Sequence, residues 1–306
     1  MKAEIGIIGG SGLYDFPGLQ SPRDVRVRTP FGSPSAPYRV GMLEGRCVAF
    51  LARHGIGHRV QPSEINVRAN IHGFRQLGVT RVISASAVGS MREEIEPLHL
   101  LVPDQLIDRT VSRPMSFFGS GIVAHVSLAD PFCSVLREAL IQAGHKAGAR
   151  VHARGTYLCI EGPQFSTRAE SDLYRSWGVE VIGMTNFPEA RLAREAELCY
   201  STLALVTDYD CWRETEDAVS VDAVLSNLKR NADTAVRVIK QTVRALPAER
   251  SCGCSRALAT ALITQPPFPA AAKRRLGLLI RPYDKPSRAA TPARRRRPAR
   301  AAGARR

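Results

Sequence analysis

Two carboxylates lie directly after an apolar segment of this chain, at a spacing that suits chemistry on a bound ligand. Residues 203–206 are all apolar and predict a buried strand, and Asp208 and Asp210 follow it. In open α/β sheets, ligands bind beyond the carboxyl ends of the strands. A carboxylate there accepts a hydrogen bond from an exocyclic amine, and a protonated carboxyl donates one to a ring nitrogen. An ordinary acidic turn has the same residue types, so the rest of the chain decides between the two interpretations.

Three more predicted strands end in residue types that bind anions. Glycine and hydroxyl residues after a strand let backbone N–H groups approach an anion closely, arginine offers a fork of donors, and histidine offers a further donor. The residues are Ser11 after the strand at 5–8, Arg53 and His54 after the strand at 48–51, and Ser86 with Ala87 where the strand at 79–86 ends. The glycine-rich turn around Ser11 lacks the spacing of a dinucleotide site and the lysine of a P-loop. Each strand end alone could be an ordinary turn without a binding role, but three such strand ends on one chain favour a single phosphate site.

Neither the histidines nor the cysteines predict a metal site. His54 and His58 are four residues apart, a spacing that suits a metal on a helix, but the glycines at 55 and 57 disfavour a helix. Seven cysteines are scattered along the chain, and an odd number favours free thiols. Cys252 and Cys254 are too close together for a usual zinc knuckle, and no second pair follows them. They form either a local redox pair or two thiols at a helix start.

Strands that alternate with helices predict an α/β fold with a largely buried sheet. Further strands are expected at 100–103 and 179–183, and helices at 62–77, 129–143, 188–197, 221–246, 256–262 and 270–280. One face of the helix at 221–246 carries Val221, Val224, Leu225 and Leu228, and this face is either core or the wall of an apolar pocket. Phe165 follows a strand break and is either a core side chain or a stacking platform for a base. We expect one domain over residues 1–284.

The basic character of the chain is concentrated at its end. Residues 285–306 hold nine basic residues and no acidic ones, so the formal net charge is +15 for the chain but +6 without this segment. Its Pro, Ala and Arg composition predicts a disordered tail. Such a tail either contacts nucleic acid weakly and nonspecifically or is simply solvated, and its deletion should leave catalysis intact. No apolar run is long enough for a membrane span, and no signal peptide starts the chain, so we expect a cytoplasmic protein.

Six short motifs along the chain carry a family resemblance. They are GGSGL at 9–13, TPFG at 29–32, RHG at 53–55, EGP at 161–163, GMT at 183–185 and TDYDCW at 207–212. Together they resemble the trimeric purine nucleoside phosphorylases, and within that superfamily the methylthioadenosine phosphorylases, over about residues 3–283. The resemblance implies a single-domain fold with a central mixed β-sheet flanked by helices. It also implies a phosphate-dependent pentosyltransferase of purine and methionine salvage. Such an enzyme converts methylthioadenosine and inorganic phosphate to adenine and 5-methylthioribose 1-phosphate, without a cofactor or metal.

The matching motif positions imply roles for individual residues. Phosphate binding falls to Ser11, Arg53, His54, Ser86, Ala87 and Thr185. The residues implied to bind the substrate are Met184 along the ribose, Phe165 on the purine, and Asp208, Tyr209 and Asp210 at the base. The two aspartates are implied to be catalytic, facing the amino group and N7 of the purine. Ser166 matches a specificity position. The apolar wall that receives the 5′-methylthio group is formed by Val221, Val224 and Leu225. His125 matches a specificity residue that reaches a neighbouring subunit's site. A homotrimer is implied.

The main alternative is a phosphorylase of 6-oxopurine nucleosides on the same fold. The resemblance implies asparagine at position 208 in such enzymes, because an amide donates to O6 whereas a carboxylate accepts from a 6-amino group. Mismatched polar groups in a dry site discriminate strongly between substrates. Asp208 therefore favours a 6-aminopurine.

Overall fold

The computed structural model describes residues 2–213 and 221–284, with side chains for residues 2–213 and 226–284. Two predictions lie outside these described residues. They are the side-chain roles of Val221, Val224 and Leu225, and the basic tail at 285–306.

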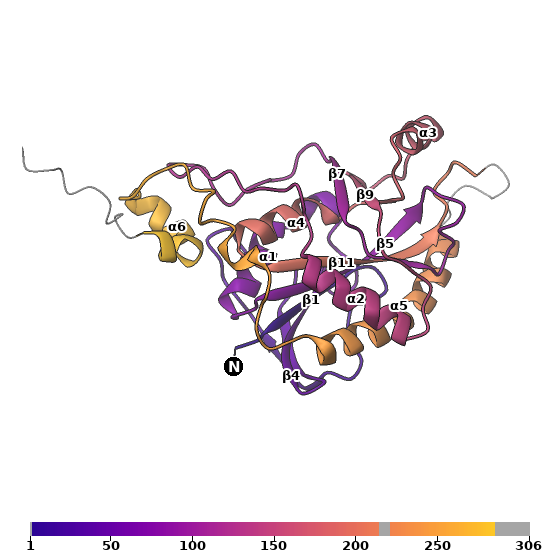
Figure 1. Ribbon diagram of the computed structural model, residues 1–306, viewed down its shortest axis with the longest axis horizontal. Helices are drawn as coiled ribbons and strands as arrows, with labels where there is room; N and C mark the ends of the chain where they lie inside the picture. Colours follow the sequence, from indigo (N-terminus) through magenta and orange to yellow (C-terminus); the bar gives the residue numbers. More distant parts are fainter. Residues whose placement is uncertain (1, 214–220, 285–306) are drawn as a thin grey trace, which may run out of the picture.

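A mixed sheet forms the centre of the described part of the chain (Figure 1). Its strands are β1 (Ile5–Gly9), β2 (Gln20–Val25), β3 (Tyr38–Leu43), β4 (Arg46–Ala52), β5 (Arg81–Ser90), β6 (Leu100–Leu101), β7 (Gln105–Arg109), β8 (Val151–His152), β9 (Thr156–Ile160), β10 (Val181–Gly183) and β11 (Cys199–Asp208). The main path runs β2-β3-β4-β1-β5-β10-β9-β7, and β11 pairs with β5 and β6. Strand β1 runs parallel to β4 and β5, and β5 runs parallel to β11, so several carboxyl ends point the same way. The predicted α/β fold with a mixed sheet is confirmed.

Helices cover both faces of this sheet. They are α1 (Val67–Gln76), α2 (Ser134–Lys146), α3 (Arg168–Ser176), α4 (Asn186–Glu195), α5 (Val221–Ala245) and α6 (Ala270–Ile280), with short 3₁₀ turns η1 (Pro62–Glu64), η2 (Gly253–Arg256) and η3 (Arg281–Tyr283). Helix α1 packs with α4, and α2 packs with α5 (Figure 1). Helices α6 and α3 lie at opposite ends of the molecule (Figure 1). None of the helices in the described ranges is long and apolar enough to cross a membrane.

Strand β11 is buried on both faces, which explains why its central residues 203–206 are all apolar. Leu203 and Leu205 belong to the hydrophobic cluster that includes α2 and α5. Tyr200 belongs to the cluster that includes α1 and α4. Because successive side chains of a strand point to opposite faces, this one strand joins the two halves of the core.

Three of the predicted helices are wrong in their extent, and the one expected at 129–143 begins five residues later, as α2. The helix expected at 62–77 divides into η1 and α1, because the side chain of Asn66 caps a new start by accepting the N–H of Ala69 at 3.1 Å. No helix forms over 256–262. Instead η2 ends at Arg256, and the following backbone bonds to a neighbouring loop, with the N–H of His125 donating to the carbonyl of Ala261 at 2.8 Å. The N–H groups of residues 257, 259 and 261 donate to residues three positions earlier, so this segment forms turns and not the i→i−4 bonds of an α-helix.

Strand β5 runs to Ser90, four residues beyond the predicted end, because it changes partner along one edge. Strand β1 pairs with its first part, as far as Ser84, and β10 pairs antiparallel with Gly89 and Ser90. On that edge, residues 85–88 have no strand partner in the described part of the chain, while β11 pairs with the opposite edge. The gap leaves main-chain polar groups of β5 available at the centre of the sheet.

We predict that acid destabilises the fold through a buried histidine of α1. His72 lies against Phe31 and Phe117, and burial lowers its pKa to about 4. The unfolded chain therefore binds more protons between pH 6.5 and pH 4, so stability falls as the pH falls through that window. For one such group the loss between pH 7 and pH 5 is roughly 2 kcal/mol.

Urea unfolding of wild type and His72→Leu at both pH values measures this contribution. We expect the variant to lose a smaller amount of stability than wild type on acidification. The exposed His145, changed to Leu, is the matched control and should leave the pH dependence unaltered. Equal pH dependence in wild type and His72→Leu would show that His72 is not buried in its neutral form.

Candidate active site

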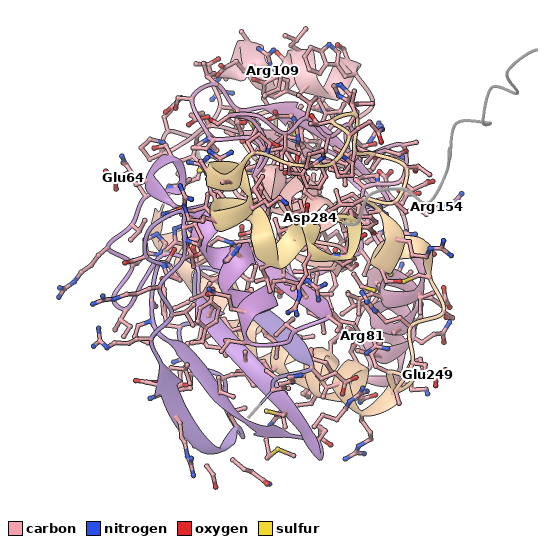
Figure 2. All side chains as sticks on the ribbon, turned by 90° about the vertical axis from the view of Figure 1, so that its left-hand side faces the viewer. Glu64, Arg81, Arg109, Arg154, Glu249 and Asp284 are labelled. Atoms are coloured by element: carbon pink, nitrogen blue, oxygen red, sulfur yellow. The ribbon has the colours of Figure 1, made fainter. Side chains whose placement is uncertain are left out.

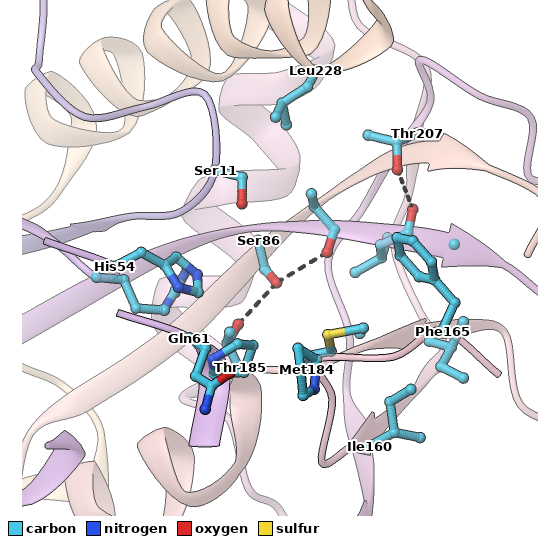
Figure 3. Close-up of a pocket in the computed structure, with 18 of the residues that line it drawn as sticks. Ser11, His54, Gln61, Ser86, Ile160, Phe165, Met184, Thr185, Thr207 and Leu228 are labelled. Atoms are coloured by element: carbon cyan, nitrogen blue, oxygen red, sulfur yellow. Dashed lines mark hydrogen bonds between the residues drawn. The ribbon is translucent and has the colours of Figure 1, made fainter. Parts of the chain in front are cut away.

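One cavity of about 710 Å³ opens where strand ends of the sheet converge (Figure 3). Eleven of the residues predicted from the sequence line it: Ser11, Arg53, His54, Ser86, Ala87, Phe165, Ser166, Met184, Thr185, Asp208 and Asp210. They come from the ends of β1, β4, β9, β10 and β11 and the turns that follow them, and from the part of β5 that lacks a strand partner on one edge. The separate strand ends therefore do form one site.

Hydroxyl groups gather at one end of the cavity. The Oγ of Ser86 lies 3.0 Å from the Tyr157 hydroxyl. It also lies 3.2 Å from Thr185 Oγ1 (Figure 3). Burial raises the pKa of Tyr157 to about 12, so its hydroxyl stays neutral and can donate. Gly183 makes this arrangement possible, since a Cβ there would lie 2.0 Å from the Tyr157 oxygen. Ser11 faces the same end from the turn after β1 (Figure 3).

The guanidinium of Arg53 is held rigidly beneath this end. It is almost fully buried, and its Nε and Nη2 donate to the two carboxylate oxygens of Glu189 at 2.6 and 3.2 Å. Nη2 also donates to Ser84 Oγ at 2.6 Å, and Nη1 donates to the carbonyl of Ala85 at 2.8 Å. These bonds use four of the five N–H groups of arginine and leave one, on Nη1, directed to other partners. The pair carries no net charge, so an anion here depends on hydrogen-bond donors as much as on Arg53.

His54 is a neutral acceptor in this site rather than the donor expected from the sequence. Its Nδ1 lies 2.8 Å from the carbonyl of Val60, and a carbonyl can only accept, so Nδ1 carries the proton. Burial, assisted by the charge of Arg53, lowers the pKa of His54 to about 4. The ring stacks on that of His58 with centroids 4.3 Å apart. Nε2 is therefore an acceptor at neutral pH, which suits a protonated oxygen of hydrogen phosphate.

Asp208 stands at the other end of the cavity with both carboxylate oxygens oriented by donors. Oδ2 accepts from Thr207 Oγ1 at 2.6 Å, and Oδ1 accepts from the backbone N–H of Asp210 at 2.8 Å. A β-bulge between Val206 and Asp208 turns this end of β11 against Gly89 of β5. A Cβ on Gly89 would lie 2.8 Å from Asp208 Oδ1, so glycine is required for this close approach.

Asp210 is the more deeply buried of the two aspartates. Its backbone is in the left-handed region (φ 55°), which aspartate tolerates better than most residues. Oδ2 accepts a hydrogen bond from Ser171 Oγ of α3 at 2.6 Å. Burial raises the pKa of Asp210 despite this hydrogen bond. A carboxyl of this kind can keep its proton and pass it to a bound base.

Apolar groups connect the two ends of the cavity. Met184 and Ile160 lie along it, and Phe165 borders its outer side (Figure 3). Phe165 is 45% exposed, so the core interpretation is wrong and the stacking interpretation remains. Leu228 of α5 closes the cavity near Ser11 and is the fourth residue of the predicted apolar stripe (Figure 3).

Two predicted residues lie outside this cavity. The side chain of Tyr209 points away from it, and the hydroxyl donates to the carbonyl of Glu93 at 3.2 Å. The alternation of side chains around the end of β11 places Asp208 and Asp210 in the cavity and Tyr209 against Trp212 instead. His125 is exposed on a loop and does not line the cavity of its own chain.

Several residues that shape the site were not singled out in the sequence. Glu189 orients Arg53 and Ser171 orients Asp210. Arg113 is buried and donates to the carbonyls of Met184 at 2.7 Å and Glu161 at 2.6 Å, so it ties together the segments after β9 and β10. Leu228, by contrast, was named in the sequence as part of an apolar stripe. The others act through partners that are distant in the sequence.

Comparison with known proteins agrees with this geometry. A model of the phosphorylase superfamily matches residues 4–244. The chain belongs to the phosphorylase superfamily. The family resemblance seen in the sequence is thereby confirmed.

This superfamily member has curated relatives named S-methyl-5′-thioadenosine phosphorylase. The protein from Koribacter versatilis is 59% identical over 284 residues, which is 92% of this chain and 97% of the relative. That from Geobacter sulfurreducens is 56% identical over 92% of this chain and all of the relative. Among solved structures, a methylthioadenosine phosphorylase from an antarctic soil metagenomic library is 51% identical, with a TM-score of 0.86 over 91% of this chain and 99% of that one. The Schistosoma mansoni methylthioadenosine phosphorylase in complex with adenine is 37% identical, with a TM-score of 0.77 over 81% and 93%.

We predict that this superfamily member depends on Glu189 for stability. Glu189→Gln leaves the buried guanidinium of Arg53 without its counter-charge, and removing one partner of a buried pair costs about 3–5 kcal/mol. The measurement is urea unfolding at neutral pH. Asp15→Asn is the control, because the Asp15–Arg39 pair is exposed and such pairs contribute at most about 1 kcal/mol. Similar decreases of the unfolding free energy in the two variants would show that the buried Arg53–Glu189 pair stabilises the fold no more than an exposed pair does.

Proposed function

We propose that this protein is a phosphorylase of S-methyl-5′-thioadenosine. It converts methylthioadenosine and phosphate reversibly to adenine and 5-methylthioribose 1-phosphate, a step of purine and methionine salvage. The observation that carries the proposal is a single cavity with anion donors at one end and two oriented carboxyl groups at the other. The choice of methylthioadenosine as the substrate is supported by the relatives, which are named methylthioadenosine phosphorylases.

Phosphate binds at the hydroxyl-lined end in this proposal. Ser11, Ser86 and Thr185 donate from their side chains, and Ala87 lies in the stretch of β5 without a strand partner on one edge, where a backbone N–H can donate. Arg53 adds its remaining N–H, and Nε2 of His54 accepts the proton of hydrogen phosphate. The phosphate is thus held in one orientation, with an oxygen directed at C1′ of the ribose beside Met184. Phosphate is the co-substrate, and this arrangement calls for no cofactor.

The two carboxyl groups act on the leaving purine. A phosphate oxygen forms the new bond to C1′ while the bond from C1′ to N9 breaks and its electron pair moves to the purine. Asp210, whose pKa is raised by burial, donates its proton to N7 and neutralises the departing base. Asp208 accepts from the 6-amino group, since donors from Thr207 and the Asp210 backbone fix its carboxylate as an acceptor. The purine packs on Phe165.

The methylthio group occupies the apolar side of the cavity near α5. Leu228 lines the cavity there, and Val221, Val224 and Leu225 precede it on the same face of the helix by sequence spacing. We assign these residues to recognition of the 5′-substituent, and we assign Ser166, which lies beside Asp210 and Cys211, to substrate specificity at the purine end. A sulfur-bound methyl gains from burial among such side chains, whereas the hydroxyl of adenosine would lose hydrogen bonds to water.

A homotrimer completes the site in this proposal. His125 is exposed on a loop and lies outside the cavity of its own chain, so it is free to reach a neighbouring subunit. We assign it to the sugar end of that neighbour's site. A mass of three chains in sedimentation equilibrium is the corresponding expectation.

We predict distinct defects for the two aspartates. The substrates are methylthioadenosine and 5′-methylthioinosine, which differ only at position 6 of the purine. Wild type should strongly prefer the amino compound. Asp208→Asn should shift the ratio of kcat/KM toward the oxo compound by about 100-fold, because an amide can donate to O6. Asp210→Asn cannot donate an acidic proton and should lower kcat by about 100-fold or more on both substrates.

The pH profile separates the two roles. The alkaline limb of kcat/KM should vanish in Asp210→Asn and persist in Asp208→Asn. Loss of that limb in Asp208→Asn instead would exchange the roles of the two residues. Preference of wild type for the oxo compound would overturn the proposed substrate and favour the 6-oxopurine alternative.

We also predict that Gly89→Ala impairs catalysis more than folding. The added methyl collides with Asp208 Oδ1 and touches Ile182, so the carboxylate must move. A displacement of about 1 Å can cost on the order of 100-fold in rate. The measurement is kcat/KM for methylthioadenosine together with the melting temperature. Gly277→Ala in α6 has open space around its Cβ and is the matched control, which should keep full activity. Unchanged activity of Gly89→Ala would contradict the close approach.

A further inference from the structure

Four cysteines that are far apart in the sequence meet at one place in the fold. Cys133, Cys199, Cys252 and Cys254 each offer one sulfur atom, and all four sulfur atoms lie within 4.8 Å of one another. The sulfur atoms of Cys199 and Cys252 are 3.2 Å apart. The sequence shows only the pair at 252 and 254, and the second pair that a zinc site needs lies upstream, at 133 and 199.

The spacing of these sulfur atoms suits tetrahedral coordination. Zinc binds thiolate at about 2.3 Å, which places the sulfur atoms of a four-cysteine site about 3.8 Å apart. The observed separations extend to 4.8 Å, so side-chain movements below about 1 Å complete the tetrahedron. Four thiolates fill every position of such an ion and leave none open for a substrate.

We propose that these four cysteines bind one zinc ion in a closed structural site. The site lies at the start of β11, whereas Asp208 lies at the end of the same strand, nine residues away and so about 30 Å distant. The ion would connect β11, the start of α2 and the turn η2. It would take no part in the reaction at the other end of the sheet.

The segments that carry the cysteines are positioned by contacts of their own. The N–H of Cys133 donates to the carbonyl of Tyr200 at 2.8 Å, and that of Cys199 donates to Thr80 at 3.0 Å. Arg81 donates to the carbonyls of residues 247–249 that lead toward η2, and Figure 2 shows Arg81 and Glu249 on the same side of the molecule. The ligand positions are therefore largely formed before an ion binds, which lowers the cost of ordering them.

The surroundings also suit a metal thiolate. Cys133, Cys199 and Cys254 are at most 5% exposed, so the ion would be shielded from water. The site would carry two net negative charges, and Nη1 of Arg194 lies 3.9 Å from the Cys254 sulfur. A cation at that distance stabilises thiolate charge and orients the ligand. Two disulfides would use the same four cysteines, and the experiment below distinguishes them from an ion.

Metal analysis of the full chain tests the proposal. Protein purified without metal-affinity resin, reduced and freed of metal, is mixed with excess zinc and passed through a desalting column. We expect about one zinc per chain, and binding of cobalt in its place should give thiolate charge-transfer absorption and the d–d bands of tetrahedral coordination. The variant with both Cys252→Ser and Cys254→Ser should lose this zinc and this spectrum, and it should keep the catalytic rate of wild type. Cys47→Ser, outside the cluster, is the matched control and should bind zinc as wild type does.

Two outcomes would overturn the proposal. The first is reduced wild-type protein that retains no zinc and shows no tetrahedral cobalt spectrum. The second is untreated protein in which mass spectrometry finds a disulfide among the four cysteines, and in which denaturant exposes fewer than the seven thiols that the chain contains. Retention of zinc by the double serine variant would place the ion elsewhere and would equally contradict the assignment.

Discussion

The buried pair of Arg53 and Glu189 is the interaction on which the active site depends. Both side chains are 1% exposed, and a charge in that position is tolerated only with a partner and a full set of hydrogen bonds. Glu189 also accepts from the hydroxyl of Tyr200 at 2.8 Å, and Arg53 reaches Ser84 and the carbonyl of Ala85. The pair thereby joins the end of β4, the middle of β5, helix α4 and strand β11. Movement of any one of these elements would leave a buried charge unpaired, so the anion end of the cavity is rigid.

Departures from a regular sheet create the places where ligands bind. Strand β5 has no partner on one edge between the end of β1 and the start of its pairing with β10, and this gap faces the hydroxyl groups of Ser86 and Thr185. The bulge near the end of β11 presents two carboxyl groups to the same cavity. Asn227 and Asn231 of α5 donate to the carbonyls of Thr207 and Val206, and so hold the bulge in place. Regular pairing would have satisfied these backbone groups and closed the cavity.

The sequence predicted those parts of the site that follow from local pattern. Asp208 and Asp210 were recognisable because they directly follow a buried strand, and Arg53 and His54 because they follow another. The partners of these residues were not recognisable, since Glu189 is 136 positions from Arg53 and Ser171 is 39 positions from Asp210. A hydrogen bond changed the expected role of His54 from donor to acceptor, because its Nδ1–H donates to the carbonyl of Val60 and leaves Nε2 to face the ligand.

Errors in the predicted fold have the same origin. The helix expected at 256–262 has suitable residues, but it forms turns with i→i−3 bonds, and its last two residues pair with the segment at 123–125. Strand β5 was predicted too short because nothing local indicates that β10 will pair with its end. The four cysteines show the effect most clearly, since the sequence shows only the close pair Cys252 and Cys254, and the fold brings Cys133 and Cys199 to it.

The most direct test of the link between the two ends of the cavity is the release of adenine from methylthioadenosine as a function of phosphate concentration. A hydroxyl-lined anion site and a purine site in one cavity predict that release requires phosphate, saturates with it and yields 5-methylthioribose 1-phosphate in amounts equal to adenine. Release at the same rate without phosphate, with free 5-methylthioribose as the product, would mean that water is the nucleophile. That result would contradict the role of Ser11, Ser86 and Thr185 as the phosphate site.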